Sequence, residues 1–96
     1  MKRRQLVWTE RAEADLVGIG DFISRDDPVA ARRWVGLLMV TARAAARHPF
    51  AGRRVPELQR DDVREVFLER YRIVYRVCAR QCEVLTVFEG HQQLDL

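Results

Sequence analysis

The sequence lacks most of the short motifs by which enzymes are first identified. It has no Gly-rich phosphate-binding loop, no H-E-x-x-H zinc motif and no G-x-S-x-G nucleophile motif. A Ser-His-Asp triad would need the single serine, Ser24, together with His48 or His91. Because Ser24 falls where we expect a helix to end, the sequence does not predict hydrolase chemistry of this kind.

Long apolar runs are also absent. A membrane-spanning helix needs roughly 18 or more consecutive apolar residues, and no segment approaches this length. The basic start of the chain is followed only by Leu6-Val7-Trp8 before charges return at Glu10 and Arg11. A signal peptide needs an apolar segment of about 7–15 residues, so we expect no membrane association and a cytoplasmic location.

Cysteine is scarce, and the two that occur lie close together in the chain. Cys78 and Cys82 flank a predicted turn at residues 79–81, where they could approach closely enough to form a disulfide. In a cytoplasmic protein reduced thiols are the more common state, and the sequence leaves the redox state open. Since no further Cys or His lies nearby, we predict neither a metal site nor a cofactor.

The composition predicts one small globular domain that covers residues 1–96. Hydrophobic residues make up 48% of the chain and charged residues 32%, which argues against disorder. Lys2 is the only lysine among 17 basic residues, so arginine supplies nearly all the positive charge. Arginine favours bidentate contacts to carboxylates and phosphates, and the net charge of +3 permits an acidic or nucleic-acid partner without requiring one.

The first half of the chain predicts a strand followed by two helices. Residues 4–8 form the strand, and Thr9 suits the cap of a helix that ends near residue 25. Asp27-Pro28 suits the cap and first turn of a second helix over residues 28–48. The apolar stripes predicted to face a core are Ala12, Leu16, Ile19 and Ile23 in the first helix, and Ala31, Trp34, Leu38, Ala42 and Ala45 in the second.

The second half predicts a loop and three strands. Residues 48–57 contain two prolines and a glycine, which predicts a loop. The segment Val63–Val77 is rich in β-branched and aromatic residues on both sides of Glu69-Arg70, which predicts a tight hairpin, and residues 83–88 form a last strand. The predicted fold class is α+β, a two-layer β-α-α-β-β-β domain with an antiparallel helix pair on one face of a mainly antiparallel four-stranded sheet.

Alternation along the hairpin separates a core face from a candidate binding face. Tyr71, Ile73, Tyr75 and Val77 project to one side, which we expect to lie under the helices. Arg72 and Arg76 project to the other side, and Arg64 could join them from the neighbouring strand. Three guanidinium groups on one face could hold phosphates or a partner's carboxylates, although solvated surface arginines would give the same pattern.

Five segments occur in an order and spacing that resembles a known family. They are A-x-x-D-L-x-x-I-x-x-x-I from Ala12 to Ile23, G-R-x-V-P-E from Gly52 to Glu57, R-E-V from Arg64 to Val66, Y-R-I-V-Y-R-V from Tyr71 to Val77 and V-L-T-V-F from Val84 to Phe88. His48-Pro49 opens the loop between the second helix and the sheet. Over about residues 6–94 the chain resembles the RelE/ParE superfamily of bacterial toxins from type II toxin–antitoxin modules.

The resemblance implies a small toxin that is held inactive in a hetero-oligomer with a cognate antitoxin. ParE-like members bind DNA gyrase and have no catalytic residues of their own. RelE-like members cleave messenger RNA on the ribosome with basic residues of the sheet and a proton-transfer group near the C-terminus. In the RelE-like case the catalytic residues here would be Arg64, Arg72 and His91, although a tail histidine such as His91 is more often simply solvated.

Two positions favour binding over cleavage. Val66 and Gln92 stand where ribonuclease members of the superfamily carry basic residues. We therefore predict a ParE-like toxin without a favoured catalytic residue, in which Arg64, Arg72 and Arg76 contact the target or the antitoxin. The alternatives are a ribosome-dependent mRNA endonuclease and a basic binding domain without toxin activity.

Overall fold

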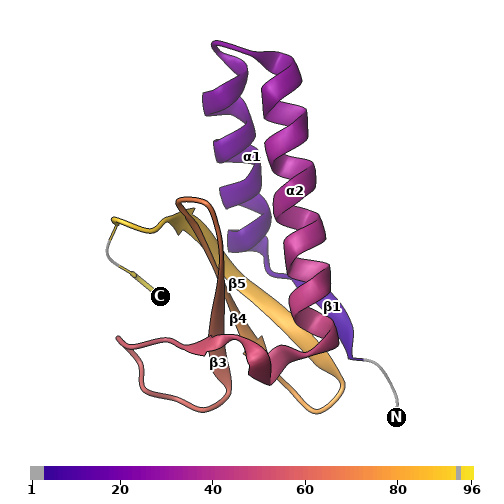
Figure 1. Cartoon of the computed structure of the whole chain (residues 1–96), viewed down its shortest axis with the longest axis vertical. Helices are drawn as coiled ribbons and strands as arrows, with labels where there is room; N and C mark the ends of the chain where they lie inside the picture. The colour runs from indigo at the N-terminus through magenta and orange to yellow at the C-terminus, as the bar shows by residue number, and fades with distance from the viewer. Residues whose placement is uncertain (1–3, 93) are drawn as a thin grey trace.

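The computed structural model describes residues 4–92 and 94–96 as a helix pair and a curved sheet (Figure 1). The elements, in chain order, are β1 (Gln5–Trp8), α1 (Glu10–Ser24), α2 (Pro28–Arg47), the short 3-10 helix η1 (Pro49–Ala51), β2 (Arg53–Arg54), β3 (Val63–Leu68), β4 (Tyr71–Val77) and β5 (Gln81–Glu89). The predicted α+β class and the order of the long elements are confirmed.

The sheet has five strands in the order β1-β5-β4-β3-β2, so the prediction of four strands was wrong by one. The additional strand is β2, whose Arg53 and Arg54 pair with Glu65 and Arg64 of β3. Two residues cannot show an alternating pattern, and the flanking Gly52 and Pro56 indicated only a loop. β1 pairs in parallel with β5, and the remaining pairs are antiparallel.

Both helices begin at the predicted caps. The Thr9 hydroxyl accepts a hydrogen bond from Ala12 N at 3.1 Å and donates to the Val84 carbonyl at 2.8 Å, which joins the start of α1 to β5. The Asp27 carboxylate accepts from Val29 N and Ala30 N, both at 3.1 Å, before Pro28 opens α2. These local contacts explain why the helix starts could be predicted from the sequence.

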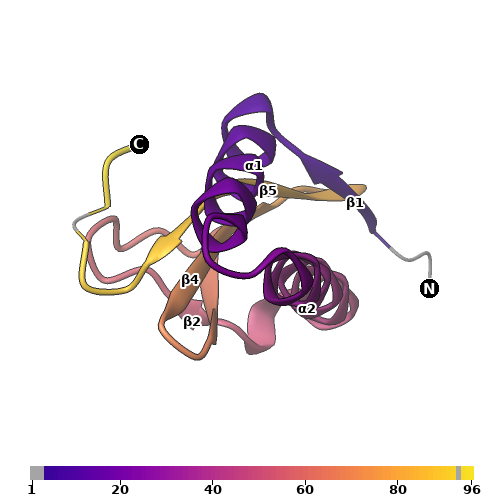
Figure 2. The ribbon, with the colours of Figure 1, turned by 90° about the horizontal axis from the view of Figure 1, so that it is seen from above.

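The main core lies between the helix pair and the sheet. Tyr71 and Ile73 of β4 are buried against Ala12, Leu38 and Ala42 of the helices, as predicted from the alternation. Figures 1 and 2 show the helices lying beside one another, with β1 and the C-terminal segment on opposite sides of the molecule. The end of the helix pair at the α1–α2 turn extends past the strands (Figure 1), so part of each helix has no sheet beneath it.

The other face of the sheet, which the sequence analysis predicted as a candidate binding face, is partly covered. Val74 is fully buried there with Val55 and Val63, and Leu94 of the tail packs against the same cluster. Val55 belongs to the segment that joins β2 to β3, which folds back over this face. The cover leaves fewer side chains of this face available to a partner than the sequence suggested.

Among the described residues, none of the helices is long and apolar enough to cross a membrane.

Candidate binding surface

Arg72, the central residue of the predicted arginine set, is buried in an ion-pair network. Only 6% of the residue is exposed. Its Nε and Nη2 donate to Glu65 Oε1 at 2.8 and 2.5 Å, while Nη1 and Nη2 donate to the two Glu57 oxygens at 3.0 and 3.1 Å. Its guanidinium carbon lies 5.0 Å from the centroid of the Phe88 ring. The donors of Arg72 are therefore already engaged with two carboxylates of the same chain.

The network closes through Arg53 of β2. The second oxygen of Glu65, whose side chain has no exposed surface, accepts from Arg53 Nε and Nη2 at 2.8 and 2.5 Å. Two guanidinium groups thus balance two carboxylates, which is the condition for keeping charges inside a protein. The hydrogen bonds from Arg72 hold the pKa of Glu57 below its ordinary value, and those from Glu57 and Glu65 raise the pKa of Arg72.

Arg64 does not join Arg72, which corrects the prediction that the three arginines share one face. In the observed register Arg64 lies opposite Tyr75, and cross-strand partners project to the same side of a sheet. Tyr75 belongs to the side that packs against Ala45 and Ala46 of α2, so Arg64 projects to the helix side. The sequence pattern could not show this, because a shift of one residue in register reverses every side chain of a strand.

Arg64 instead holds the chain that follows α2. Its Nη1 donates to the carbonyl oxygens of Phe50 and Gly52 at 3.1 and 3.0 Å, and its Nη2 pairs with Asp61 at 2.9 Å. The buried Tyr75 hydroxyl donates to the Pro49 carbonyl at 2.5 Å, and burial raises the pKa of Tyr75 to about 12. These contacts fix the connection between α2 and β2, which is a structural role.

Arg76 lies on the same side of β4 as Arg72 but is more accessible. It lines a hollow with Val63 and Leu85, on the side that also carries Val74. Its Nε and Nη2 donate to Glu83 Oε1 at 3.0 and 2.7 Å, and 44% of the Arg76 side chain remains exposed. Of the three predicted arginines, Arg76 is the one with the most side-chain surface free to meet a partner.

His91 is solvated and separate from the arginines. Its side chain is 72% exposed, and its Nδ1 lies 3.7 Å from Glu89 Oε2. No hydrogen bond within residues 4–92 and 94–96 joins His91 to Arg64 or Arg72. The described part of the chain therefore does not assemble the three residues that the endonuclease alternative would use.

Asp15, which the sequence indicated only as a member of the A-x-x-D-L segment, has a structural role. Its Oδ2 accepts hydrogen bonds from the Thr86 hydroxyl at 2.5 Å and from Val87 N at 3.0 Å. Thr86 is buried in β5, so the carboxylate anchors α1 to the centre of the sheet. The available signal was the acidic residue inside the A-x-x-D-L segment, directly before Leu16 of the apolar stripe.

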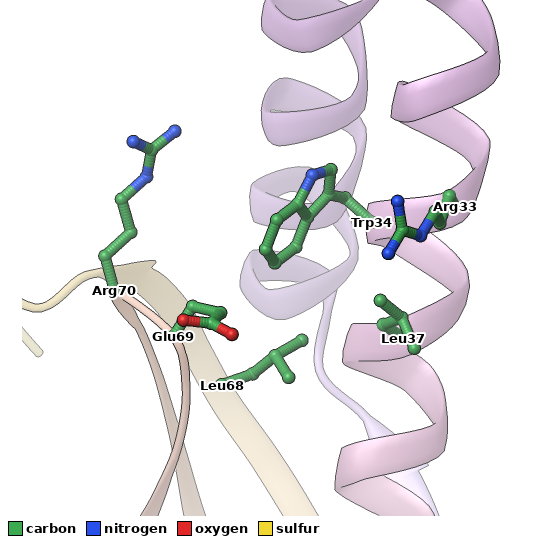
Figure 3. Close-up of a pocket in the computed structure, with 6 residues that line it drawn as sticks. All are labelled: Arg33, Trp34, Leu37, Leu68, Glu69 and Arg70. Carbon is green, nitrogen blue, oxygen red and sulfur yellow. The ribbon is translucent and has the colours of Figure 1, made fainter.

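A cleft between α2 and the hairpin turn offers a second candidate surface. Its volume is about 430 Å³, and its walls are Arg33, Trp34, Leu37, Leu68, Glu69 and Arg70. Figure 3 shows Trp34 and Leu37 on α2 facing Leu68 and the Glu69-Arg70 turn. The Trp34 and Tyr71 rings meet edge to face with centroids 5.9 Å apart, which holds the indole in place. Two arginines and one glutamate surround the apolar floor, so the rim carries a net positive charge that suits a partner segment with both apolar and acidic side chains.

The cysteines and acidic residues do not form a metal site in the described part of the chain. No group of three or more His, Cys, Asp and Glu side chains there could hold a metal ion. Cys78 and Cys82 are free thiols, and burial raises the pKa of Cys82. A raised pKa lowers the fraction of reactive thiolate at neutral pH.

Comparison with known proteins identifies relatives along nearly the whole chain. Residues 6–94 match the family described as ParE toxin of type II toxin-antitoxin system, parDE. The chain is 39% identical to "Putative toxin Y4kP" of Sinorhizobium fredii, over 97% of this chain and 95% of that protein. It is 45% identical to Toxin RelE2 of Caulobacter vibrioides, over 51% of this chain and 56% of that protein.

A solved structure shares the fold. It is a chain of a chromosomal ParDE TA system from P. aeruginosa, with a TM-score of 0.76 and 23% sequence identity. The likeness covers 91% of this chain and 96% of that chain. At this identity the structural likeness supports the arrangement of helices and sheet described above.

Proposed function

Because the chain belongs to the ParE toxin family of type II toxin–antitoxin systems, we propose that it arrests growth by binding DNA gyrase in the cytoplasm, and that a cognate antitoxin neutralises it. In this proposal the chain acts by contact and carries no catalytic residue. The toxin class rests on the family match over residues 6–94. The choice between binding and RNA cleavage rests on the geometry of the arginines.

The burial of Arg72 is the observation that carries the choice of binding over cleavage. Cleavage of RNA needs positively charged donors that are free to meet a phosphate as charge develops on it. Arg72 is 6% exposed and already neutralised by Glu57 and Glu65, while Arg64 is engaged with Phe50, Gly52 and Asp61. Making either arginine available would cost the hydrogen bonds that it makes inside the protein.

We further propose that the antitoxin occupies the cleft of Figure 3. Apolar side chains of the antitoxin would lie on Trp34 and Leu37, and acidic side chains would pair with Arg33 and Arg70. Arg76 is a direct contact for target or antitoxin, since nearly half of its side chain is exposed. Arg64 and Arg72 contribute by holding the surrounding segments in place.

The similarity to Toxin RelE2 keeps a ribosome-dependent endonuclease as the second candidate. In that case Arg64, Arg72 and His91 would act on messenger RNA, after a rearrangement that frees the two arginines. A basic binding domain without toxicity is the third candidate.

Induced expression in bacteria, with and without the neighbouring gene, tests the proposal. We expect growth arrest that the neighbouring gene relieves, together with cleaved plasmid DNA and intact messenger RNA. Cuts in translated messages with undamaged DNA would establish the endonuclease instead. Normal growth at confirmed expression of folded protein would leave only the non-toxic binding domain.

A further inference from the structure

The surface of the helix pair that faces away from the sheet carries charges of opposite sign on its two helices. Glu10, Glu13 and Asp21 lie exposed on α1, while α2 contains four arginines and no acidic residue. The one arginine of α1, Arg11, lines the hollow beside Leu58 and Leu85 instead. None of Glu10, Asp21, Arg32 or Arg43 takes part in an ion pair within residues 4–92 and 94–96. These four charges are therefore available to a partner, with acidic groups on α1 and basic groups on α2.

An apolar groove runs between the two charged edges. Its volume is about 460 Å³, and it is lined by Gly20, Ser24, Pro28, Ala31, Val35, Gly36 and Met39, with Asp21 and Arg32 at its sides. A Cβ placed on Gly36 would meet nothing within 4 Å, so this part of the groove is open to an incoming side chain. Met39 of this lining is 37% exposed, and Val17 of α1 is 62% exposed, so apolar side chains of both helices are open to solvent.

The charges on the two helices have the same spacing. Glu10 and Asp21 are eleven positions apart, and so are Arg32 and Arg43. Eleven residues of α-helix rise about 16 Å and return to within about 20° of the same direction, so each pair lies on one side of its helix. Because α1 and α2 are antiparallel and joined by a short turn, Asp21 and Arg32 lie near the turn and the other two lie near the opposite end.

From this pattern we infer that the outer face of the helix pair binds a second copy of the chain through a two-fold axis parallel to the helices. The axis places α1 of one copy on α2 of the other, antiparallel to it. Asp21 then meets the partner's Arg32, and Glu10 meets the partner's Arg43. The apolar groove is closed by the corresponding groove of the second copy.

Other occupants fit the charges less well. A two-fold axis perpendicular to the helices would place the acids of α1 on one another, which is repulsive. A nucleic acid, or a uniformly acidic protein, would be attracted to α2 but repelled by the acids of α1. A second copy is the partner for which both edges of the surface are complementary.

The size of the face predicts a dimer that dissociates on dilution. A helix of 15 residues is about 22 Å long, and two packed helices span about 20 Å, giving roughly 440 Å² per copy against about 800 Å² in a standard interface. The cleft of Figure 3 lies on the other flank of α2, so this association leaves it accessible. The inference therefore does not depend on the proposed gyrase or antitoxin contacts.

Sedimentation of the purified full-length chain over a dilution series tests the inference. We expect the mass to rise towards twice the monomer mass with concentration. Gly36→Leu should keep the chain monomeric, because its side chain would fill the groove. Gly18→Leu is the matched control, since a Cβ there also meets nothing within 4 Å and the position lies on the other side of α1, facing Phe88 and Gln92. Circular dichroism checks that both variants are folded.

Charge reversal tests the pairing itself. Asp21→Arg and Arg32→Asp should each weaken association at least tenfold, and the double variant should recover it. Arg80→Asp, in the exposed β4–β5 turn, controls for the change in net charge.

A chain that remains monomeric at all concentrations, or a Gly36→Leu variant that associates like the unmodified chain, overturns the inference. Monomers that instead bind duplex DNA through Arg32 and Arg43 would also overturn it.

Discussion

Arg72 and Glu65 form a buried ion pair across β3 and β4, with Arg72 Nη2 2.5 Å from Glu65 Oε1. Glu65 has no exposed side-chain surface and also holds Arg53, so it is the common acceptor of two arginines. Arg72, which the sequence predicted as a contact to the target or the antitoxin, is therefore part of the protein interior. The effects of changing it should appear first in stability.

Replacing Glu65 with glutamine should strongly destabilise the fold. The change keeps the shape of the side chain but leaves two guanidinium groups facing one carboxylate, Glu57. We expect a loss of about 3–5 kcal/mol in the free energy of unfolding, the range for a broken buried ion pair. Urea denaturation measures it, with Glu69→Gln in the exposed hairpin turn as the control. Equal stability of the two variants would contradict the role of the network.

The contribution of Glu57 to stability should depend on pH. Its pKa is lower in the folded protein than the ordinary 4.5 because of the hydrogen bonds from Arg72. The stabilisation is therefore fully present above pH 4.5, and is lost as the pH falls through the lowered folded pKa. Urea midpoints of the unmodified chain and of Glu57→Gln should differ near neutral pH and converge in acid. A difference that grows in acid would contradict this assignment.

Gly52 should not tolerate a side chain. A Cβ at this position would collide with the Tyr75 hydroxyl and lie 3.0 Å from the Glu65 carbonyl oxygen. We expect Gly52→Ala to cost about 1–3 kcal/mol of stability through overpacking. Combining it with Tyr75→Phe, which removes the hydroxyl, should cost less than the sum of the two single changes. Strict additivity in thermal or urea unfolding would show that the two groups do not meet.

The cleft of Figure 3 should control antitoxin affinity. Leu37 is 38% exposed at its wall, so Leu37→Glu should fold normally while placing a negative charge where we propose the antitoxin's apolar and acidic side chains. We expect the affinity to fall by about tenfold or more, equivalent to roughly 1.4 kcal/mol. Val40→Glu, at a 51% exposed position of the same helix outside the cleft, is the matched control. Calorimetric titration with the neighbouring gene's product measures both.

His91 should be dispensable for toxicity. Its side chain is 72% exposed and shares no hydrogen bond with Arg64 or Arg72 in the described part of the chain. We expect His91→Ala to arrest growth to the same extent as the unmodified chain at equal expression. Loss of arrest with retained folding would favour the endonuclease candidate, in which His91 moves protons.

Local features were predictable from the sequence because the interactions that produce them are local. The caps at Thr9 and Asp27 bind backbone groups two or three residues away, and the hairpin turn at Glu69-Arg70 lies between two strand-forming runs. The motif order that indicated the toxin superfamily also depends only on the chain. These signals determined the fold class, most element boundaries and the toxin class.

The tertiary structure determined which face of the sheet each charged residue lies on and which residues it pairs with. Strand register placed Arg64 on the helix side, and the chain between β2 and β3 brought Glu57 to Arg72, fifteen positions away. It also added β2, which was too short to leave a pattern of its own. Burial and ion pairing depend on which strands become neighbours and in what register, and no periodicity along a single strand records that information. The sequence thus determined which arginines lie in the sheet, and the packing determined that Arg72 is held inside it.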